Sequence, residues 1–364
     1  MNEMHKTGSL PNRVQAVRDA LAAQSLDALI IFDPHNIRYL CGFTGEDSCL
    51  VVRPEEIILV SDFRFRLQAR AEAPLARLLE VDDTVAKALP EALTGLSGEV
   101  GVESSFLTLA RWTDVDEALA HMPHRPVKGV VEKQREVKSP DEIDRCRAAG
   151  ELAAQTMAQL TRMRVVGRTE REVALEMEMW ARQRGSGPMP FDYIVAAGPR
   201  GAMPHGVASH AVIQPRCLLV VDIGVALDGY TSDMTRTFAT GPLTSREQEM
   251  YEVVLAAQEK GRAAATHGAA AVEVDRAARA VIEAAGMGDL FRHSLGHGVG
   301  LEVHEAPRLG PRSKDTLAAG NVVTVEPGVY VDGLGGVRIE DTVAVTSSTC
   351  EVLTELEREL IELS

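Results

Sequence analysis

Two acidic residues near the middle of the sequence are spaced to meet on one face of a β-hairpin. Asp228-Gly229 predicts a two-residue hairpin turn, and the register that this turn sets places Asp222 opposite Thr235. Because side chains alternate along a strand, Asp222 and Asp233 then share a face as diagonal neighbours, about 5–8 Å apart. We expect both carboxylates to face one point, an arrangement suited to binding a cation.

A second hairpin repeats this arrangement later in the sequence. A five-residue loop over 332–336 would pair Val331 with Val337 and place Glu326 and Glu340 on one face. Four carboxylates converging on one cavity would repel one another, and their pKa values would rise unless cations neutralised them. Two divalent metal ions would balance the four negative charges.

The histidines that accompany these carboxylates lie between the two hairpins. His297 is flanked by glycines, which allow close backbone approach, and His304 follows it within the same stretch. His293 has i, i+4 spacing to His297, but Ser294 stands where the zinc-protease pattern H-E-x-x-H requires glutamate. Arg338 falls on the strand face that carries the glutamates.

The alternative interpretation is that each acidic residue is a solvated charge on a hairpin surface. It fits Asp222 poorly, because Asp222 follows the apolar run Leu218–Val221 and should be buried with that run. A ligand set rich in oxygen, with one histidine, favours Mn²⁺ or Co²⁺ and admits Zn²⁺.

Helix start signals divide the second part of the sequence into two similar halves. Capping boxes at 139–142, 169–172 and 244–247 predict the first three of four helices. The expected helices span 139–163, 169–184, 244–266 and 274–285. Each helix pair is followed by strand-rich sequence, so we predict a duplicated unit whose halves face each other. The alternative to a duplication is that helices and strands follow one another in this order by chance, as they can in any α+β domain.

The first third of the sequence predicts a smaller, separate domain. Its short apolar runs are 27–32, 49–52, 55–60 and 98–103. Helix-like segments separate these runs, which is typical of an α/β domain with a mixed sheet. A chain of 364 residues is also longer than one core usually supports. We therefore predict two domains, 1–135 and 136–364.

Composition excludes several classes of partner. With 53 Asp+Glu against 38 Lys+Arg, a net charge of −15 and no basic run, the chain is not expected to bind nucleic acid. No stretch is long and apolar enough for a membrane span, and the opening MNEMHKTGSLPNR lacks a signal-peptide core. Five scattered cysteines without a CxxC pair fit a reducing compartment. We expect a cytoplasmic protein.

These residues resemble the pita-bread metallopeptidases of family M24, in particular the Xaa-Pro branch of short bacterial aminopeptidase P and prolidase. The resemblance lies in FDYIVAAGPRGAMPHG (191–206), VDIGVALDGYTSDMTRTF (221–238), HSLGHGVGLEVHE (293–305), VEPGVY (325–330) and GGVRIED (335–341). NIRYLCGFTG (36–45) and LVSDFR (59–64) are similar to the family's smaller domain. The implied fold is an α/β creatinase-like N-terminal domain and an α+β pita-bread catalytic domain with an internal pseudo-two-fold duplication.

The resemblance implies a complete set of metal ligands. Two divalent metal ions, Mn²⁺ first and Co²⁺ or Zn²⁺ as alternatives, would be bound by Asp222, Asp233, His297, Glu326 and Glu340. Asp233 and Glu340 would bridge the two ions, and a hydroxide between the ions would be the nucleophile. Glu326 would shuttle a proton to the leaving nitrogen.

The resemblance also implies roles around the substrate. His205 and His304 would steady the substrate and the developing oxyanion. His293 would line the cleft or support the ligands, and Arg338 would hold a substrate carboxylate or a neighbouring acid. Phe191 is a candidate wall of the pocket for the proline ring, with a plain core role as its alternative.

Asp33 and His35 precede the family-like NIRYL stretch, where some relatives bring residues of one domain or of a partner subunit over the active site. An aspartate before Pro34 is otherwise an ordinary turn residue. The expected substrates are small proline-containing peptides, and the expected assembly is a homodimer.

Several activities stay open at this stage. Xaa-Pro dipeptidases and aminopeptidases differ in whether the cleft closes over the proline carboxylate, and the sequence does not separate them. A methionine aminopeptidase would lack the first domain, and a metal-free creatinase-like hydrolase would lack carboxylate ligands. A catalytically silent binding or scaffold protein would have lost ligands, whereas all five are present. The same metals would also suit a hydrolase or lyase reaction on a non-peptide substrate.

Overall fold

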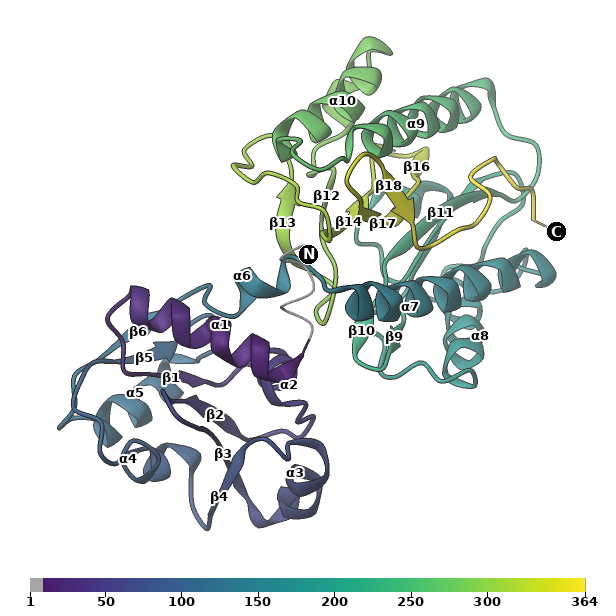
Figure 1. Cartoon of the computed structure of the whole chain (residues 1–364). Helices are drawn as coiled ribbons and strands as arrows, with labels where there is room; N and C mark the ends of the chain where they lie inside the picture. The colour runs from purple at the N-terminus through teal and green to yellow at the C-terminus, as the bar shows by residue number, and fades with distance from the viewer. Residues whose placement is uncertain (1–8, 364) are drawn as a thin grey trace. The chain divides into compact units, whose positions relative to one another are not determined.

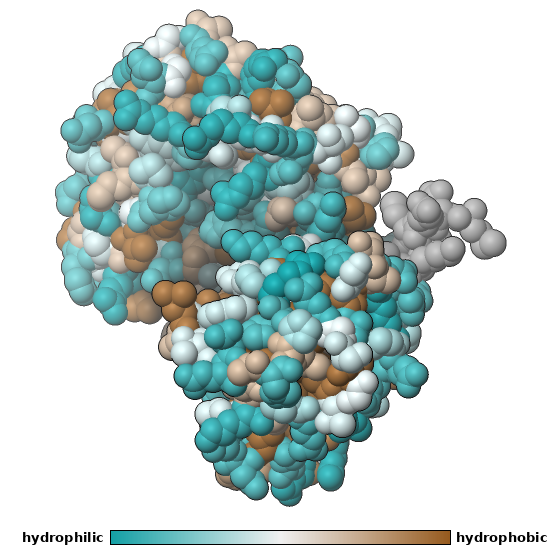
Figure 2. All heavy atoms as spheres, turned by 90° about the vertical axis from the view of Figure 1, so that its left-hand side faces the viewer, coloured by the Kyte–Doolittle hydropathy of each residue, from teal (hydrophilic) through white to brown (hydrophobic). Residues whose placement is uncertain are grey.

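The computed structural model of the chain describes residues 9–363. The chain divides after Arg135 into two compact units, Met1–Arg135 and Glu136–Ser364 (Figure 1). Most of the opening stretch that lacks a signal-peptide core lies outside the described residues. Within residues 9–363, no helix is both long and apolar enough to cross a membrane. The surface seen in Figure 2 is largely hydrophilic, with apolar residues in small groups.

The first unit is built on one six-stranded mixed sheet. Its strands are β1 (Ala28–Ile31), β2 (Cys49–Val52), β3 (Ile57–Asp62), β4 (Arg77–Val81), β5 (Val100–Glu103) and β6 (His124–Val127), in the order β4-β3-β2-β1-β5-β6. Its α-helices are α1 (Leu10–Ala23), α2 (Pro34–Cys41), α3 (Arg66–Glu72), α4 (Leu89–Ala92), α5 (Leu109–Ala118) and α6 (Glu132–Arg135). The predicted mixed sheet is confirmed, since β1 pairs antiparallel with β2 and parallel with β5. The edge strands β4 and β6 carry partly exposed side chains, so no apolar run marked them in the sequence.

The second unit has four long helices, of which the first three begin where the capping signals predicted and the fourth begins at Ala271, three residues before the predicted start. They are α7 (Pro140–Gln159), α8 (Glu170–Arg182), α9 (Ser245–Ala264) and α10 (Ala271–Ala284). Capping boxes are present before α7, α8 and α9, where the backbone N–H groups of the N-cap and N3 residues find side-chain acceptors. Figure 1 shows β11 (Met234–Ala239), β14 (Val322–Val325) and β17 (Asp341–Val345) of this unit between the α7–α8 pair and the α9–α10 pair.

The strands of the second unit fall into two groups, one after each helix pair. The first group comprises β7 (Ile194–Ala197), β8 (Leu218–Ile223) and β11 (Met234–Ala239), with the hairpin β9 (Ala226–Leu227) and β10 (Tyr230–Thr231). The second group comprises β12 (Gly296–Gly298), β13 (Glu305–Leu309), β14 (Val322–Val325), β17 (Asp341–Val345) and β18 (Cys350–Val352), with the hairpin β15 (Gly328–Val331) and β16 (Gly335–Arg338). Each group shares a buried core with its own helix pair. The predicted order, two helices then strands, twice over, is confirmed.

The register predicted for the first hairpin is confirmed. Leu227 pairs with Tyr230 across the turn, and Asp222 lies opposite Thr235. Asp228 and Gly229 both adopt positive φ, the conformation that this tight turn requires. Side-chain alternation therefore places the carboxylates of Asp222 and Asp233 on one face.

The register predicted for the second hairpin is wrong by two residues. Val331 pairs with Gly335 and not with Val337, so the loop spans only 332–334. Glycines at 333 and 335 with positive φ allow this tighter turn, which the Leu334 N–H closes by donating to Val331 O at 3.0 Å. Because the shift is even, it leaves the glutamates on the predicted face.

Candidate metal centre and substrate cleft

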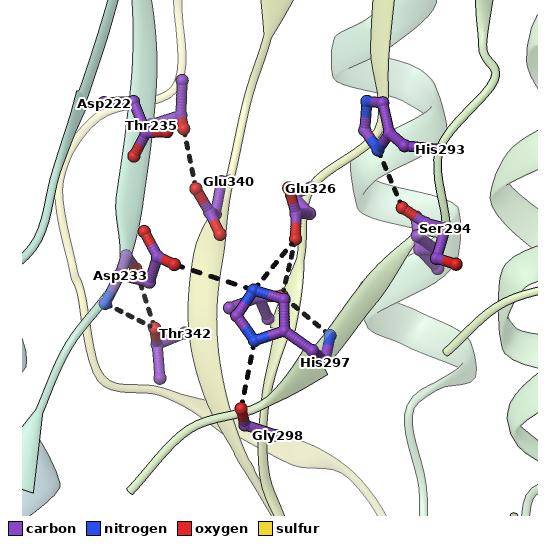
Figure 3. Close-up of polar contacts among 12 residues, drawn as sticks. Asp222, Asp233, Thr235, His293, Ser294, His297, Gly298, Glu326, Glu340 and Thr342 are labelled. Carbon is purple, nitrogen blue, oxygen red and sulfur yellow. Dashed lines mark hydrogen bonds and ion pairs between the residues drawn. The ribbon is translucent and has the colours of Figure 1, made fainter. Parts of the chain in front are cut away.

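Four carboxylates from both strand groups converge at the centre of the second unit. Asp222 lies on β8 and Asp233 immediately before β11, whereas Glu326 follows β14 and Glu340 immediately precedes β17. Asp222, Asp233 and Glu340 offer one oxygen each within 4.8 Å of one another, and His297, Glu326 and Glu340 form a second such group. The two groups share Glu340. Figure 3 shows these side chains pointing into a common space.

His297 presents one ring nitrogen to this space in a defined tautomer. Its Nδ1 lies 3.0 Å from the carbonyl oxygen of Gly298, which only accepts, so Nδ1 carries a proton and donates. Its Nε2 lies 3.3 Å from Glu326 Oε1 and 3.7 Å from Asp233 Oδ2 (Figure 3). Nε2 is thus the nitrogen that would bind a metal ion placed among these carboxylates, once it has released its own proton.

Three buried carboxylate oxygens of the candidate ligands have no hydrogen-bond partner in the described part of the chain. They are Asp222 Oδ1, Asp233 Oδ1 and Glu340 Oε1. Leaving a buried charged acceptor unpaired costs more than the roughly 1–3 kcal/mol of a neutral group. Cation binding satisfies such oxygens, so the residues present fit divalent metal ions.

The electrostatics of the centre also call for positive charge. Burial raises the pKa values of Asp233 and Glu340 well above their usual range, and the neighbouring carboxylates raise them further. Burial also raises the pKa of Glu326, but its hydrogen bond and ion pair with His297 outweigh this effect and lower that pKa to about 2. The pKa of His297 is lowered by burial, yet the pairing with Glu326 leaves it above the ordinary value. Bound cations would replace the protons that otherwise neutralise this cluster.

Hydroxyl groups and one arginine orient the candidate ligands. Thr235 Oγ1 donates to Glu340 Oε2 at 2.7 Å, and Thr324 Oγ1 donates to Glu326 Oε1 at 3.1 Å. Arg338 Nη2 donates to Asp222 Oδ2 at 2.6 Å and is buried. Of the two roles predicted for Arg338, this contact favours holding a neighbouring acid.

A hydrogen-bond chain extends from Arg338 to His293 through Tyr330. Arg338 Nη1 donates to Tyr330 Oη at 2.8 Å, and Tyr330 Oη lies 3.1 Å from His293 Nε2. His293 Nδ1 lies 2.8 Å from the carbonyl of Ser294, so Nε2 accepts from the tyrosine. His293 lines the cavity, and this chain of contacts connects it to Asp222. Tyr330 was not singled out from the sequence, although it closes the VEPGVY stretch that was.

A cavity of about 590 Å³ opens beside the carboxylates. All nine sequence-predicted site residues line it, together with Phe191. His205 and His304 are exposed, and the His304 ring lies 4.4 Å from that of His297, centroid to centroid. Arg292 and Arg308 also line the cavity. Sequence patterning did not identify these two arginines, because isolated charged residues are ordinary on a surface.

Asp33 and His35 belong to the first unit and have a local structural role there. Asp33 caps the start of α2, accepting from the backbone N–H of His35 at 2.8 Å. This contact is the ordinary turn function of an aspartate before proline.

Comparison with known proteins places this architecture in a family. Residues 144–347 match metallopeptidase family M24, and residues 13–137 match the creatinase/prolidase N-terminal domain. A structure of Xaa-Pro dipeptidase from Bacillus anthracis is 35% identical, with a TM-score of 0.94 over 98% of this chain and 100% of that one. The Xaa-Pro dipeptidase of Pyrococcus horikoshii is 35% identical over 96% of this chain and 98% of its own. An X-Pro aminopeptidase structure from Thermotoga maritima is 31% identical, with a TM-score of 0.87 over 95% and 99% of the two chains.

The chain belongs to metallopeptidase family M24. Its first unit is the creatinase-like domain, and its second unit is the pita-bread catalytic domain of that family. The predicted fold class is thereby confirmed.

Proposed function

We propose that this chain is a two-metal exopeptidase that hydrolyses Xaa-Pro peptide bonds. The observation that carries the proposal is the set of three unpartnered, buried carboxylate oxygens beside His297 Nε2, on the wall of an open cavity. Similar proteins named Xaa-Pro dipeptidase and X-Pro aminopeptidase support the choice of substrate.

The two overlapping ligand groups suggest where two cations would bind. Asp222, Asp233 and Glu340 would hold one ion, and His297, Glu326 and Glu340 the other. Asp233, whose Oδ2 lies 3.7 Å from His297 Nε2, would bridge the two ions together with Glu340. Bound divalent cations would supply water activated to hydroxide at neutral pH and would polarise the substrate carbonyl. Four carboxylates and one histidine favour Mn²⁺, with Co²⁺ or Zn²⁺ as alternatives.

Residues of the chain would transfer the proton, stabilise the oxyanion and orient the substrate and the metal ligands. Glu326 would carry the proton from the attacking water to the leaving nitrogen, since its carboxylate lines the cavity and lies 3.3 Å from His297 Nε2. His304 and His205, both exposed on the cavity wall, would stabilise the oxyanion and orient the substrate. Arg338 would keep Asp222 oriented through their contact of 2.6 Å.

Proline after the scissile bond has no N–H to donate, so its ring must be recognised by shape. Phe191, Ile194 and Val207 provide apolar wall for such a ring. Whether peptides longer than two residues fit decides between dipeptidase and aminopeptidase. The family resemblance also predicts a cytoplasmic homodimer, for which sedimentation and cell fractionation are the tests.

The test is hydrolysis by Mn²⁺-reconstituted protein of a Xaa-Pro dipeptide and of the same peptide extended by one residue. Xaa-Ala peptides of both lengths serve as controls. We expect release of the N-terminal residue from the Xaa-Pro peptides. Cleavage of the dipeptide alone identifies a dipeptidase, and cleavage of the tripeptide an aminopeptidase.

The matched variant is Asp233→Asn, which should lose both turnover and stoichiometric Mn²⁺. An active, fully metallated variant would contradict the bridging role of Asp233. If wild-type protein binds Mn²⁺ but cuts no peptide, a non-peptide substrate or a scaffold role replaces the proposal.

A further inference from the structure

A buried ion cluster lies next to the candidate ligands without lining the cavity. Arg236 follows Thr235 on β11, and Asp341 follows Glu340 at the start of β17. Successive side chains of a strand point to opposite faces, so Arg236 points away from the carboxylate face on which Thr235 contacts Glu340. Arg236 and Asp341 are only 2% and 0% exposed, and they pair at 2.8 Å.

Arg236 joins the two ligand-bearing strands to a distant segment of the chain. Its Nη1 donates to the carbonyl oxygens of Thr235 at 3.0 Å and Glu340 at 2.6 Å. Its Nη2 and Nε donate to the carbonyl oxygens of Leu356 and Glu357, at 2.9 and 3.1 Å. The planar guanidinium thus fixes the Glu340 backbone against β11 and against residues 353–363.

Asp341 is held by two cations and one amide. Besides Arg236, Gln258 Nε2 donates to its Oδ2 at 2.7 Å, and Arg358 Nε donates to the same oxygen at 2.5 Å. Two arginines against one aspartate leave the cluster with a net charge of +1. Arg358 is 16% exposed, whereas the other charged members are buried.

Residues 353–363, which we call the tail segment, are anchored along their length. The Leu353 N–H donates to Thr342 O at 2.9 Å, and the Leu363 N–H donates to Ala239 O at 2.8 Å. Between these points, Tyr251 Oη donates to the carbonyl of Arg358 at 2.6 Å. The segment therefore connects the start of β17, next to Glu340, with the end of β11 at Ala239.

We propose that the tail segment is a positioning element of the metal centre. Arg358 and Arg236 clamp Asp341, and this clamp holds the adjacent Glu340 where its carboxylate reaches both ligand groups. The proposal rests on the proposed metal site. It assigns the affinity for metal partly to a segment that contributes no ligand and touches no substrate.

Electrostatics and positioning predict opposite results when Arg358 is neutralised. Removing a positive charge near the carboxylates would strengthen cation binding by Coulomb attraction alone. Loosening Glu340 would weaken it, because supporting contacts of metal ligands typically contribute about 10- to 100-fold in affinity. The sign of the change therefore identifies the mechanism.

The experiment titrates metal-free full-length variants with Mn²⁺ by calorimetry and records the visible spectrum with Co²⁺. We expect Arg358→Gln to bind Mn²⁺ about 10-fold or more weakly than the wild-type protein and to show an altered Co²⁺ spectrum. Arg358→Lys should recover part of the affinity. Tyr251→Phe removes only the hydroxyl that anchors the tail segment and should also weaken Mn²⁺ binding. This second variant keeps the proposal testable if the Arg358 variants do not fold.

The control is Val274→Ala, a core truncation on α10 that lowers stability without touching the cluster. Its Mn²⁺ affinity should stay at the wild-type value. Equal or tighter binding by Arg358→Gln and Tyr251→Phe would overturn the positioning role. Failure of the wild-type protein to bind stoichiometric Mn²⁺ would instead overturn the proposed function, so the two failures are distinguishable.

Discussion

The candidate ligands differ in how completely the protein satisfies them. Glu326 accepts from Thr324 and pairs with His297, whereas Asp233 and Glu340 each keep a buried oxygen without a partner. The least satisfied oxygens thus include those of the two residues proposed to bridge the ions. A protein interior retains such groups at a high free-energy cost, and cation binding offsets that cost.

His304 provides a residue-scale test of ligand against substrate contact. We expect His304→Ala to bind Mn²⁺ with wild-type stoichiometry and to lose about 10²- to 10³-fold in kcat, the usual cost of removing an oxyanion donor. Metal content by atomic absorption and peptide turnover check the two halves of this prediction. His304 also forms a possible ligand group with Asp233 and His297. Loss of metal would therefore assign His304 to the metal centre.

At the scale of elements, β12 leaves almost no room for side chains larger than glycine on either side of His297. It lies between β13 and β14 and carries His297 between two glycines. A Cβ on Gly296 would come within 2.0 Å of Thr324 O, and one on Gly298 within 2.1 Å of Ala306 O. The glycines are therefore required by close backbone approach, which explains the glycine-flanked pattern around His297.

Gly296→Ala should displace β12 and with it the Nε2 of His297. We expect a loss of about 1–3 kcal/mol in the free energy of unfolding, as for other overpacked sites, and weaker Mn²⁺ binding. Gly187→Ala is the matched control, since the new Cβ would meet its nearest atom at an ordinary 3.5 Å. Denaturant titration and calorimetry measure both quantities. Wild-type metal affinity in Gly296→Ala would refute the steric role of this glycine.

At the scale of the whole molecule, the candidate metal centre is built from two halves of the second unit, and each half has its own core. β8 and β11 bring Asp222 and Asp233 from the first half, while β12, β14 and β17 bring His297, Glu326 and Glu340 from the second. Charge repulsion among these groups should therefore oppose the packing of the halves unless protons or cations neutralise it.

This repulsion predicts how the stability of the metal-free protein changes with pH. The raised pKa values of Asp233 and Glu340 mean that the folded state holds protons which the unfolded state releases above about pH 4. The free energy of unfolding should then fall as pH rises from 5 to 8, by up to about 1.4 kcal/mol per pH unit for each retained proton. The lowered pKa of Glu326 acts only below this window.

Urea denaturation of chelator-treated protein at several pH values measures this slope. Added Mn²⁺ should remove most of the slope, because it binds the ionised carboxylates, and its stabilising effect should be largest at pH 8. Glu340→Gln, which cannot ionise, should show a shallower slope without metal. A stability that rises with pH in the metal-free protein would contradict the raised pKa values.

Much of this protein could be predicted from local sequence. Capping boxes predicted three helix starts, and the Asp228-Gly229 turn predicted the facing of Asp222 and Thr235, because both depend on residues close together in the chain. The five candidate ligands were named from hairpin alternation together with a family resemblance. Edge strands β4 and β6 escaped this reasoning because exposed strands have no apolar run.

Packing between distant segments decided the rest. The tighter loop at 332–334 shifted the second hairpin by two residues, and only the even size of that shift kept Glu326 and Glu340 on the predicted face. Tyr330 joins Arg338 to His293, and Arg358 reaches Asp341 from the tail segment, through contacts that no spacing rule describes. Turns and alternation follow from neighbouring residues, whereas buried hydrogen-bond partners are chosen only when separate elements close around a shared core.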